Sequence, residues 1–107
     1  MSLTRSRTRN QTTLSKLAKM LAALNGEYAF CMGLLNANEL GSADGERLSG
    51  HVARLQAKRA AVRLTLLQFN PVLDVDSIGS LDDWRLRLGK RSVSAKNLQC
   101  RLLAELT

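Results

Sequence analysis

The fold of this chain is decided by the stretch LSKLAKMLAALNGEYAFCMGLL, which runs from residue 14 to residue 35. Its large apolar side chains recur at alternating intervals of three and four residues for three heptads, which places them on one face of an α-helix. The spacing predicts a helix that packs against a second helix along this stripe. The large stripe consists of Leu14, Leu17, Leu21, Leu24, Tyr28, Cys31 and Leu35.

A second stripe, of small residues, runs along the same predicted helix. Ala22, Gly26, Ala29 and Gly33 follow one another at intervals of four, three and four residues. Each glycine costs a helix about 1 kcal/mol relative to alanine, so the pair indicates either a tight helix contact or a helix end at Asn25-Gly26. The continuous helix is the preferred interpretation, because the large stripe keeps its phase across these two residues.

Residues 20–35 are apolar over most of the circumference of this helix, which is more surface than one partner helix covers. We therefore expect the first helix to contact a second copy of the chain, giving a dimer or a tetramer. The predicted interface, part of which also forms the core of the hairpin, joins the large stripe to Gly26, Ala29 and Gly33.

A second long helix is predicted after the turn-rich segment 36–45, ending at Asn70-Pro71. It carries its own apolar stripe, interrupted by Arg59, for which Glu27 is a conceivable partner. His51 falls on the polar side, so we expect a solvated histidine rather than a catalytic one. The apolar stripe consists of Leu48, Val52, Leu55, Val62, Leu66 and Phe69.

Two shorter helices are predicted after the second long helix. Residues 71–79 are turn-like, and Val72, Leu73 and Ile78 are expected to pack on the hairpin. A capping box that starts at Ser80 predicts a helix over 81–88, and Ser92 or Ser94 can cap a helix over 95–106.

The predicted fold class is all-α: a long, coiled-coil-like antiparallel hairpin over 13–69 with two short C-terminal helices. A disordered basic arm, 1–11, precedes a single helical domain, 12–107. The arm is too polar to offset its ordering entropy by burial.

The net charge of +7 is arranged in blocks, with +5 and no acidic residue over 1–19 and +5 over 84–107. This pattern is compatible with a nucleic-acid partner, although solubility and charge pairing between blocks are the preferred explanation. The possible nucleic-acid ligands are Arg5, Arg7, Arg9, Lys90, Arg91, Lys96 and Arg101.

Enzymatic function is not indicated by any motif. The chain has one histidine and no pattern that joins a nucleophile to a base, and it has no phosphate-binding loop or dinucleotide fingerprint. Asp74 and Asp76 begin a calcium-like loop, but Ile78 and Arg85 stand where oxygen ligands belong. No cofactor or metal is expected.

The two cysteines, the lack of a signal peptide and the lack of a bilayer-spanning run predict a cytoplasmic protein.

A helix-turn-helix is the sharper alternative for the C-terminal region. The helices predicted over 81–88 and 95–106, joined through Gly89, have about the required length. Arg85, however, stands where a small residue normally lets the two helices close. The preferred interpretation is therefore a helix pair that buttresses the hairpin.

The junction Leu66-Leu67-Gln68-Phe69-Asn70-Pro71, followed by Asp74 and Ile78, resembles a segment found after a helical hairpin in short uncharacterised bacterial proteins. The run Gly89-Lys90-Arg91 stands downstream, as in those proteins. The resemblance covers about a dozen residues and implies a bacterial origin and a helical hairpin, but no activity.

The sequence therefore predicts a non-enzymatic helical module for protein–protein interaction or scaffolding, self-associating through its first helix. The alternative is a small basic regulator that binds DNA or RNA.

Overall fold

The computed structural model describes residues 2–37, 39–89 and 93–107, with side chains from residue 11 onward. Five helical elements follow one another: α1 (Ser2–Ala37), α2 (Ser42–Phe69), the 3₁₀ helices η1 (Val75–Ser77) and η2 (Asp83–Leu88), and α3 (Ala95–Glu105). The described residues contain no strand, which confirms the all-α class.

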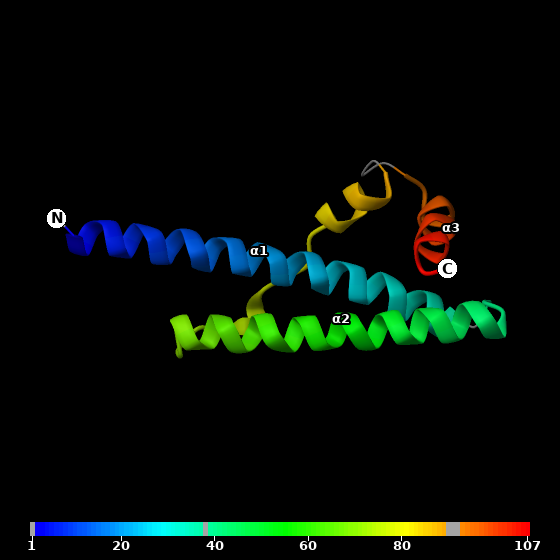
Figure 1. Ribbon diagram of the computed structural model, residues 1–107, viewed down its shortest axis with the longest axis horizontal. Helices are drawn as coiled ribbons and strands as arrows, with labels where there is room; N and C mark the ends of the chain where they lie inside the picture. The colour runs from blue at the N-terminus through cyan, green and yellow to red at the C-terminus, as the bar shows by residue number, and fades with distance from the viewer. Residues whose placement is uncertain (1, 38, 90–92) are drawn as a thin grey trace.

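The two long helices lie side by side and antiparallel, as the large stripe predicts (Figure 1). They give the molecule an elongated shape of 58 × 25 × 22 Å. α1 passes through Asn25-Gly26 without a break, so the helix end considered there does not occur.

The N-terminal turns of α1 extend past the end of α2 (Figure 1). The backbone is helical from Ser2, where the sequence predicted a separate arm over 1–11. Neither glycine nor proline occurs before Gly26, so nothing in this segment ends the helix that begins there.

The large stripe of α1 packs within its own chain. Near the open end of the hairpin, Leu21 and Leu66 form a cluster with Val75 of η1, and Leu14 and Leu17 pack against it. Leu73 and Ile78 also join this cluster. Val72 does not, because it is 91% exposed.

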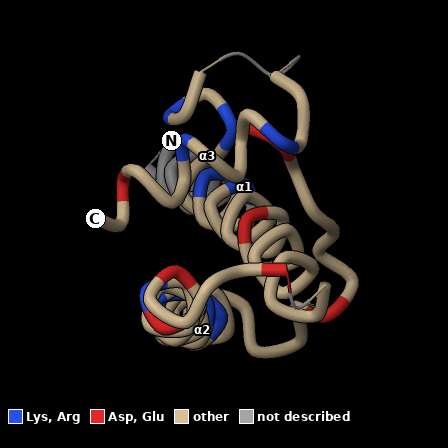
Figure 2. Tube along the Cα trace, turned by 90° about the vertical axis from the view of Figure 1, so that its right-hand side faces the viewer, with Lys and Arg blue, Asp and Glu red and all other residues tan. Residues whose placement is uncertain are grey.

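The C-terminal elements cover a further flank of α1, toward the closed end of the hairpin. Figures 1 and 2 place η2 and α3 across α1 from most of α2. The apolar side chains of the four elements merge into one cluster there. Its buried members are Cys31, Leu48, Leu55, Trp84, Leu88, Leu98 and Leu102. The chain itself therefore supplies a second cover for α1, a role that the sequence analysis assigned to another copy.

Close approach at Gly26 allows η2 to pack on α1. A Cβ at Gly26 would collide with the carbonyl oxygen of Leu81 and would lie 2.9 Å from the indole Nε1 of Trp84. The backbone N–H of Leu81 donates to the carbonyl oxygen of Ala22 at 3.0 Å. The small stripe is thus used at Ala22 and Gly26 for an intrachain contact.

Two of the predicted helix boundaries need correction. The helix expected over 81–88 is the 3₁₀ helix η2, and its N-cap is Asp82, so the capping box from Ser80 does not form. α2 begins at Ser42 rather than near residue 46, after the extended Gly41. Of the two serines considered as a cap for the last helix, Ser94 takes the role and accepts from the N–H of Asn97.

Candidate functional site

Four charged or titratable side chains from four elements meet beside the core. They are Glu27 of α1, His51 of α2, Arg87 of η2 and Glu105 of α3, named below the Glu27 cluster. Glu27 is only 2% exposed and His51 only 9% exposed. Burial of this extent is unusual for a carboxylate and requires compensating partners.

Both carboxylate oxygens of Glu27 are occupied. Oε2 lies 2.6 Å from Nε2 of His51. Arg87 donates from its two terminal nitrogens, to Oε1 at 3.1 Å and to Oε2 at 2.9 Å. The remaining guanidinium nitrogen, Nε, donates to Glu105 at 2.9 Å. Such a bidentate pair is among the stronger hydrogen-bonding arrangements in proteins.

The surroundings keep Glu27 ionised. Burial raises the pKa of its carboxyl group, but hydrogen bonds from Arg87 and His51 outweigh burial, so the pKa lies below its ordinary value of 4.5. The hydrogen bond between Arg87 and Glu27 in turn raises the pKa of the Arg87 guanidinium above its ordinary value. The cluster therefore holds a fixed negative charge paired with a fixed positive charge.

Cys31 lies one helical turn from Glu27 and belongs to the same buried region. Its side chain is fully buried, and burial together with the nearby Glu27 charge raises the pKa of the thiol to about 12. Cys31 is therefore a thiol rather than a reactive thiolate. One donor atom from each of Glu27, Cys31 and His51 lies within 4.8 Å of the other two.

A shallow pocket of about 260 Å³ gives the cluster an opening to solvent. Glu27 and Arg87 line its polar side, and Trp84 lines its apolar side. The other lining residues are Met20, Ala23, Leu24 and Asp83.

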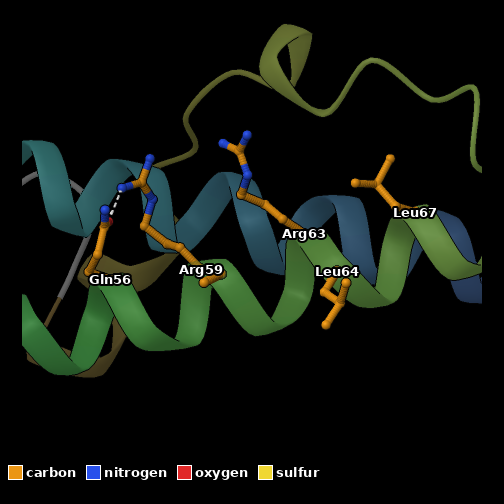
Figure 3. Close-up of a pocket in the computed structure, with 6 residues that line it drawn as sticks. Gln56, Arg59, Arg63, Leu64 and Leu67 are labelled. Carbon is orange, nitrogen blue, oxygen red and sulfur yellow. Dashed lines mark hydrogen bonds between the residues drawn. The ribbon is translucent and has the colours of Figure 1, made fainter.

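A larger hollow, of about 360 Å³, lies along α2, as Figure 3 shows. Its two cations are already engaged. Arg63 binds Asp76 at 2.8 Å, and Arg59 donates to Asn25 and Gln56 at 2.8 and 2.6 Å. The guanidinium of Arg59 also lies 4.2 Å from the centroid of the Tyr28 ring. No catalytic arrangement is formed by the residues that line this hollow.

Two members of the Glu27 cluster lie in surroundings other than those that their sequence positions predict. His51 was expected in solvent and is buried, because it lies between Leu48 and Leu55 on the face of α2 that packs against α1, where it contacts Glu27. Glu27 was considered a partner for Arg59 but pairs with His51 and Arg87. One signal was present: Glu27 is the only acidic residue before Glu39, and it stands in the most apolar stretch of the chain.

The predicted interface of α1 is divided between the core and the surface. Leu21 and Cys31 are buried, and Leu14, Leu17, Leu24, Tyr28 and Leu35 are partly buried against the two clusters. Gly26 is covered by Leu81 and Trp84. Ala29 and Gly33 remain exposed.

Of the predicted nucleic-acid ligands, few fall on described side chains. Lys96 is exposed, whereas Arg101 donates to the carbonyl oxygen of Leu88 at 2.6 Å and packs beside Gly89. Lys90 and Arg91, and the side chains of Arg5, Arg7 and Arg9, lie outside the described residues. Figure 2 shows basic residues on α1, on α2 and on the C-terminal segments, so no single element carries the net charge.

Comparison of the chain with protein-family models, with curated proteins and with solved structures found no match. Within the part of the chain that the structure describes, no helix has the length and apolar character needed to cross a membrane.

Proposed function

We propose that this protein is a non-enzymatic interaction module that self-associates through α1. The observation that carries the proposal is that Ala29 and Gly33, one turn apart on α1, are both exposed. A Cβ built on Gly33 meets nothing within 4 Å. Small side chains on an open helix face allow a second helix to approach closely.

The charge of α1 favours an antiparallel arrangement of two copies. Residues 1–19 carry +5 with no acidic residue, so parallel helices would bring like charges together. An antiparallel two-fold pair centred near Ala29 and Gly33 keeps the two basic segments apart. A two-fold interface of this kind uses the same patch on both copies.

The absence of an exposed nucleophile at the Glu27 cluster supports a non-enzymatic role. The thiol of Cys31 is buried, and Glu27 is fully engaged by Arg87 and His51. The hydrogen bonds of Arg87 to Glu27 and to Glu105 hold η2 and α3 against the hairpin.

Light scattering after size exclusion tests self-association. We expect a dimer at micromolar concentration, converted to a monomer by Gly33→Arg, which places a long cation at the centre of the interface. Gly45→Arg is the matched control, because a Cβ at Gly45 also meets nothing within 4 Å and that residue lies in α2. A wild-type monomer at these concentrations contradicts the proposal.

Nucleic-acid binding is the second candidate, supported by a specific surface of α1. Lys16 and Lys19 are exposed and line a hollow with Gln11, Thr12 and Ser15. Neither lysine forms an ion pair with a described residue. The lining of this hollow includes no acidic residue, and ammonium, hydroxyl and amide groups are typical phosphate ligands.

Fluorescence anisotropy with random-sequence duplex DNA tests this candidate. The logarithm of the binding constant falls linearly with the logarithm of the salt concentration. If Lys16 and Lys19 contact phosphates, the double change to Gln makes this slope shallower by about two. Arg54→Gln combined with Lys58→Gln is the control, because both residues are exposed cations on α2. No binding at low salt, or equal loss in both double variants, would rule out this site.

A further inference from the structure

The buried side chains of Glu27, Cys31 and His51 bring three different metal-ligand types together. Glu27 and Cys31 are one turn apart on α1, and His51 faces them from α2. Their donor atoms lie within 4.8 Å of one another. Glu27 and Cys31 are buried, and the side chain of His51 is 11% exposed. The donors come from rigid helices, which suits a site of fixed geometry.

The donor set matches zinc better than the other common divalent cations. A carboxylate oxygen, a thiolate sulfur and an imidazole nitrogen are the three ligand types that zinc takes, whereas calcium and magnesium prefer oxygen. Ligands around tetrahedral zinc lie roughly 3.3–3.7 Å apart, from bond lengths of about 2.0–2.3 Å. To bind zinc, Nε2 of His51 and Oε2 of Glu27, now 2.6 Å apart, must move apart. The widest distance between two donor atoms must shorten by about 1 Å.

The charges around the site also favour a cation. With His51 as the neutral imidazole that a metal ligand must be, Glu27 and Glu105 carry two negative charges against the one positive charge of Arg87. Zinc with the thiolate of Cys31 adds one net positive charge. The Glu27 cluster then carries no net charge, and the buried carboxylate of Glu27 gains a second cationic partner.

We propose that Glu27, Cys31 and His51 bind one Zn²⁺ ion, with water in the fourth position on the side of the shallow pocket that Met20, Leu24 and Trp84 line.

Arg87 has a defined place in this site. Zinc takes Oε2 of Glu27, the oxygen that now accepts from His51 and from one terminal nitrogen of Arg87. The other terminal nitrogen of Arg87 keeps its hydrogen bond to Oε1 of Glu27, and Nε of Arg87 keeps its hydrogen bond to Glu105. A ligating carboxylate is commonly oriented by a second hydrogen bond of this type.

Binding requires the loss of one proton. The S–H bond of Cys31 breaks, a zinc–sulfur bond forms, and the proton leaves to solvent. The ring nitrogen of His51 that binds zinc gives up any proton it carries to the other ring nitrogen, so the imidazole stays neutral. The carboxylate of Glu27 is already ionised.

Cobalt titration of the full-length, untagged, reduced protein tests the site. Co²⁺ occupies zinc sites and reports a bound thiolate by a charge-transfer band in the near ultraviolet. We expect this band to saturate at one Co²⁺ per chain, with release of one proton for each Co²⁺ bound. Addition of Zn²⁺ should displace Co²⁺ and remove the band without further proton release. Absence of the band overturns the proposal.

The second cysteine supplies the matched control. The chain has only two cysteines, and Cys100 is exposed. Cys100→Ser should keep the band, whereas Cys31→Ser should lose it and bind zinc about 100-fold more weakly or worse. If Cys31→Ser does not fold by circular dichroism, the band in Cys100→Ser still assigns the thiolate. Loss of the band in Cys100→Ser overturns the proposal.

Discussion

At the scale of single residues, the packing of η2 on α1 depends on the absence of a side chain at Gly26. The backbone of Leu81 and the ring of Trp84 occupy the space that a side chain at this position would fill. The usual cost of a glycine within a helix is offset here by a close contact that holds η2 against α1.

Gly26→Ala should therefore destabilise the protein, by about 1–3 kcal/mol, although alanine is the better helix former. Gly50→Ala is the comparison, because a Cβ at Gly50 meets only the Arg54 guanidinium at 3.5 Å, an ordinary contact. That change should stabilise by about 0.5–1 kcal/mol. Urea unfolding followed by circular dichroism measures both. A stabilising Gly26→Ala would show that η2 is free to move away.

At the scale of elements, η2 is held by its side chains rather than by its own hydrogen bonds. It is a 3₁₀ helix of six residues, a length at which helical structure has little stability alone. Trp84 and Leu88 are buried, and the Trp84 ring lies 5.2 Å from the ring of Phe30 between centroids. The same short element also positions Arg87 beside Glu27. Because η2 is a 3₁₀ helix, the helix-turn-helix alternative lacks its first α-helix.

Trp84→Ala should cost about 3 kcal/mol or more, because it removes a large buried side chain and leaves a cavity against α1. Leu86→Ala, in the same element but 54% exposed, should change the free energy of unfolding by less than about 0.5 kcal/mol. The two urea midpoints give the comparison. Equal effects would mean that η2 does not pack as described.

At the scale of the whole molecule, the Glu27 cluster links all the major elements by charge. α1, α2, η2 and α3 each contribute one side chain, so a change in the ionisation of Glu27 affects how all four are held together. The sign of the effect follows from the pKa, which is lower in the folded protein than in the unfolded chain. Below about pH 4.5 the unfolded chain binds more protons at this group than the folded protein does.

Stability from Glu27 should therefore be complete above about pH 4.5 and should be lost as the pH falls through the lowered value. Glu27→Gln removes this contribution and should flatten the dependence of the urea midpoint on pH in that acidic range. The measurement needs a chelator, so that bound metal does not contribute. Asp76→Asn is the control, since the pair Arg63–Asp76 is exposed and worth about 1 kcal/mol at most. Identical pH profiles for wild type and Glu27→Gln would contradict the prediction.

The sequence alone determined the parts of the fold that depend on local pattern. The spacing along residues 14–35 specifies which face of α1 is apolar, and the turn-rich segment near Gly41 separates α1 from α2. These features are readable because helical periodicity and turn chemistry act between residues close in the chain. The last helix and its cap at Ser94 were predictable for the same reason.

The tertiary structure alone decided what covers α1 and where the buried charges meet. Glu27 contacts a residue 24 positions away and another 60 positions away. Such pairs depend on the register of the hairpin and on how η2 crosses it, and residue spacing carries no information about either. Burial of His51 follows from the register of the hairpin, which places its imidazole against Glu27 of α1.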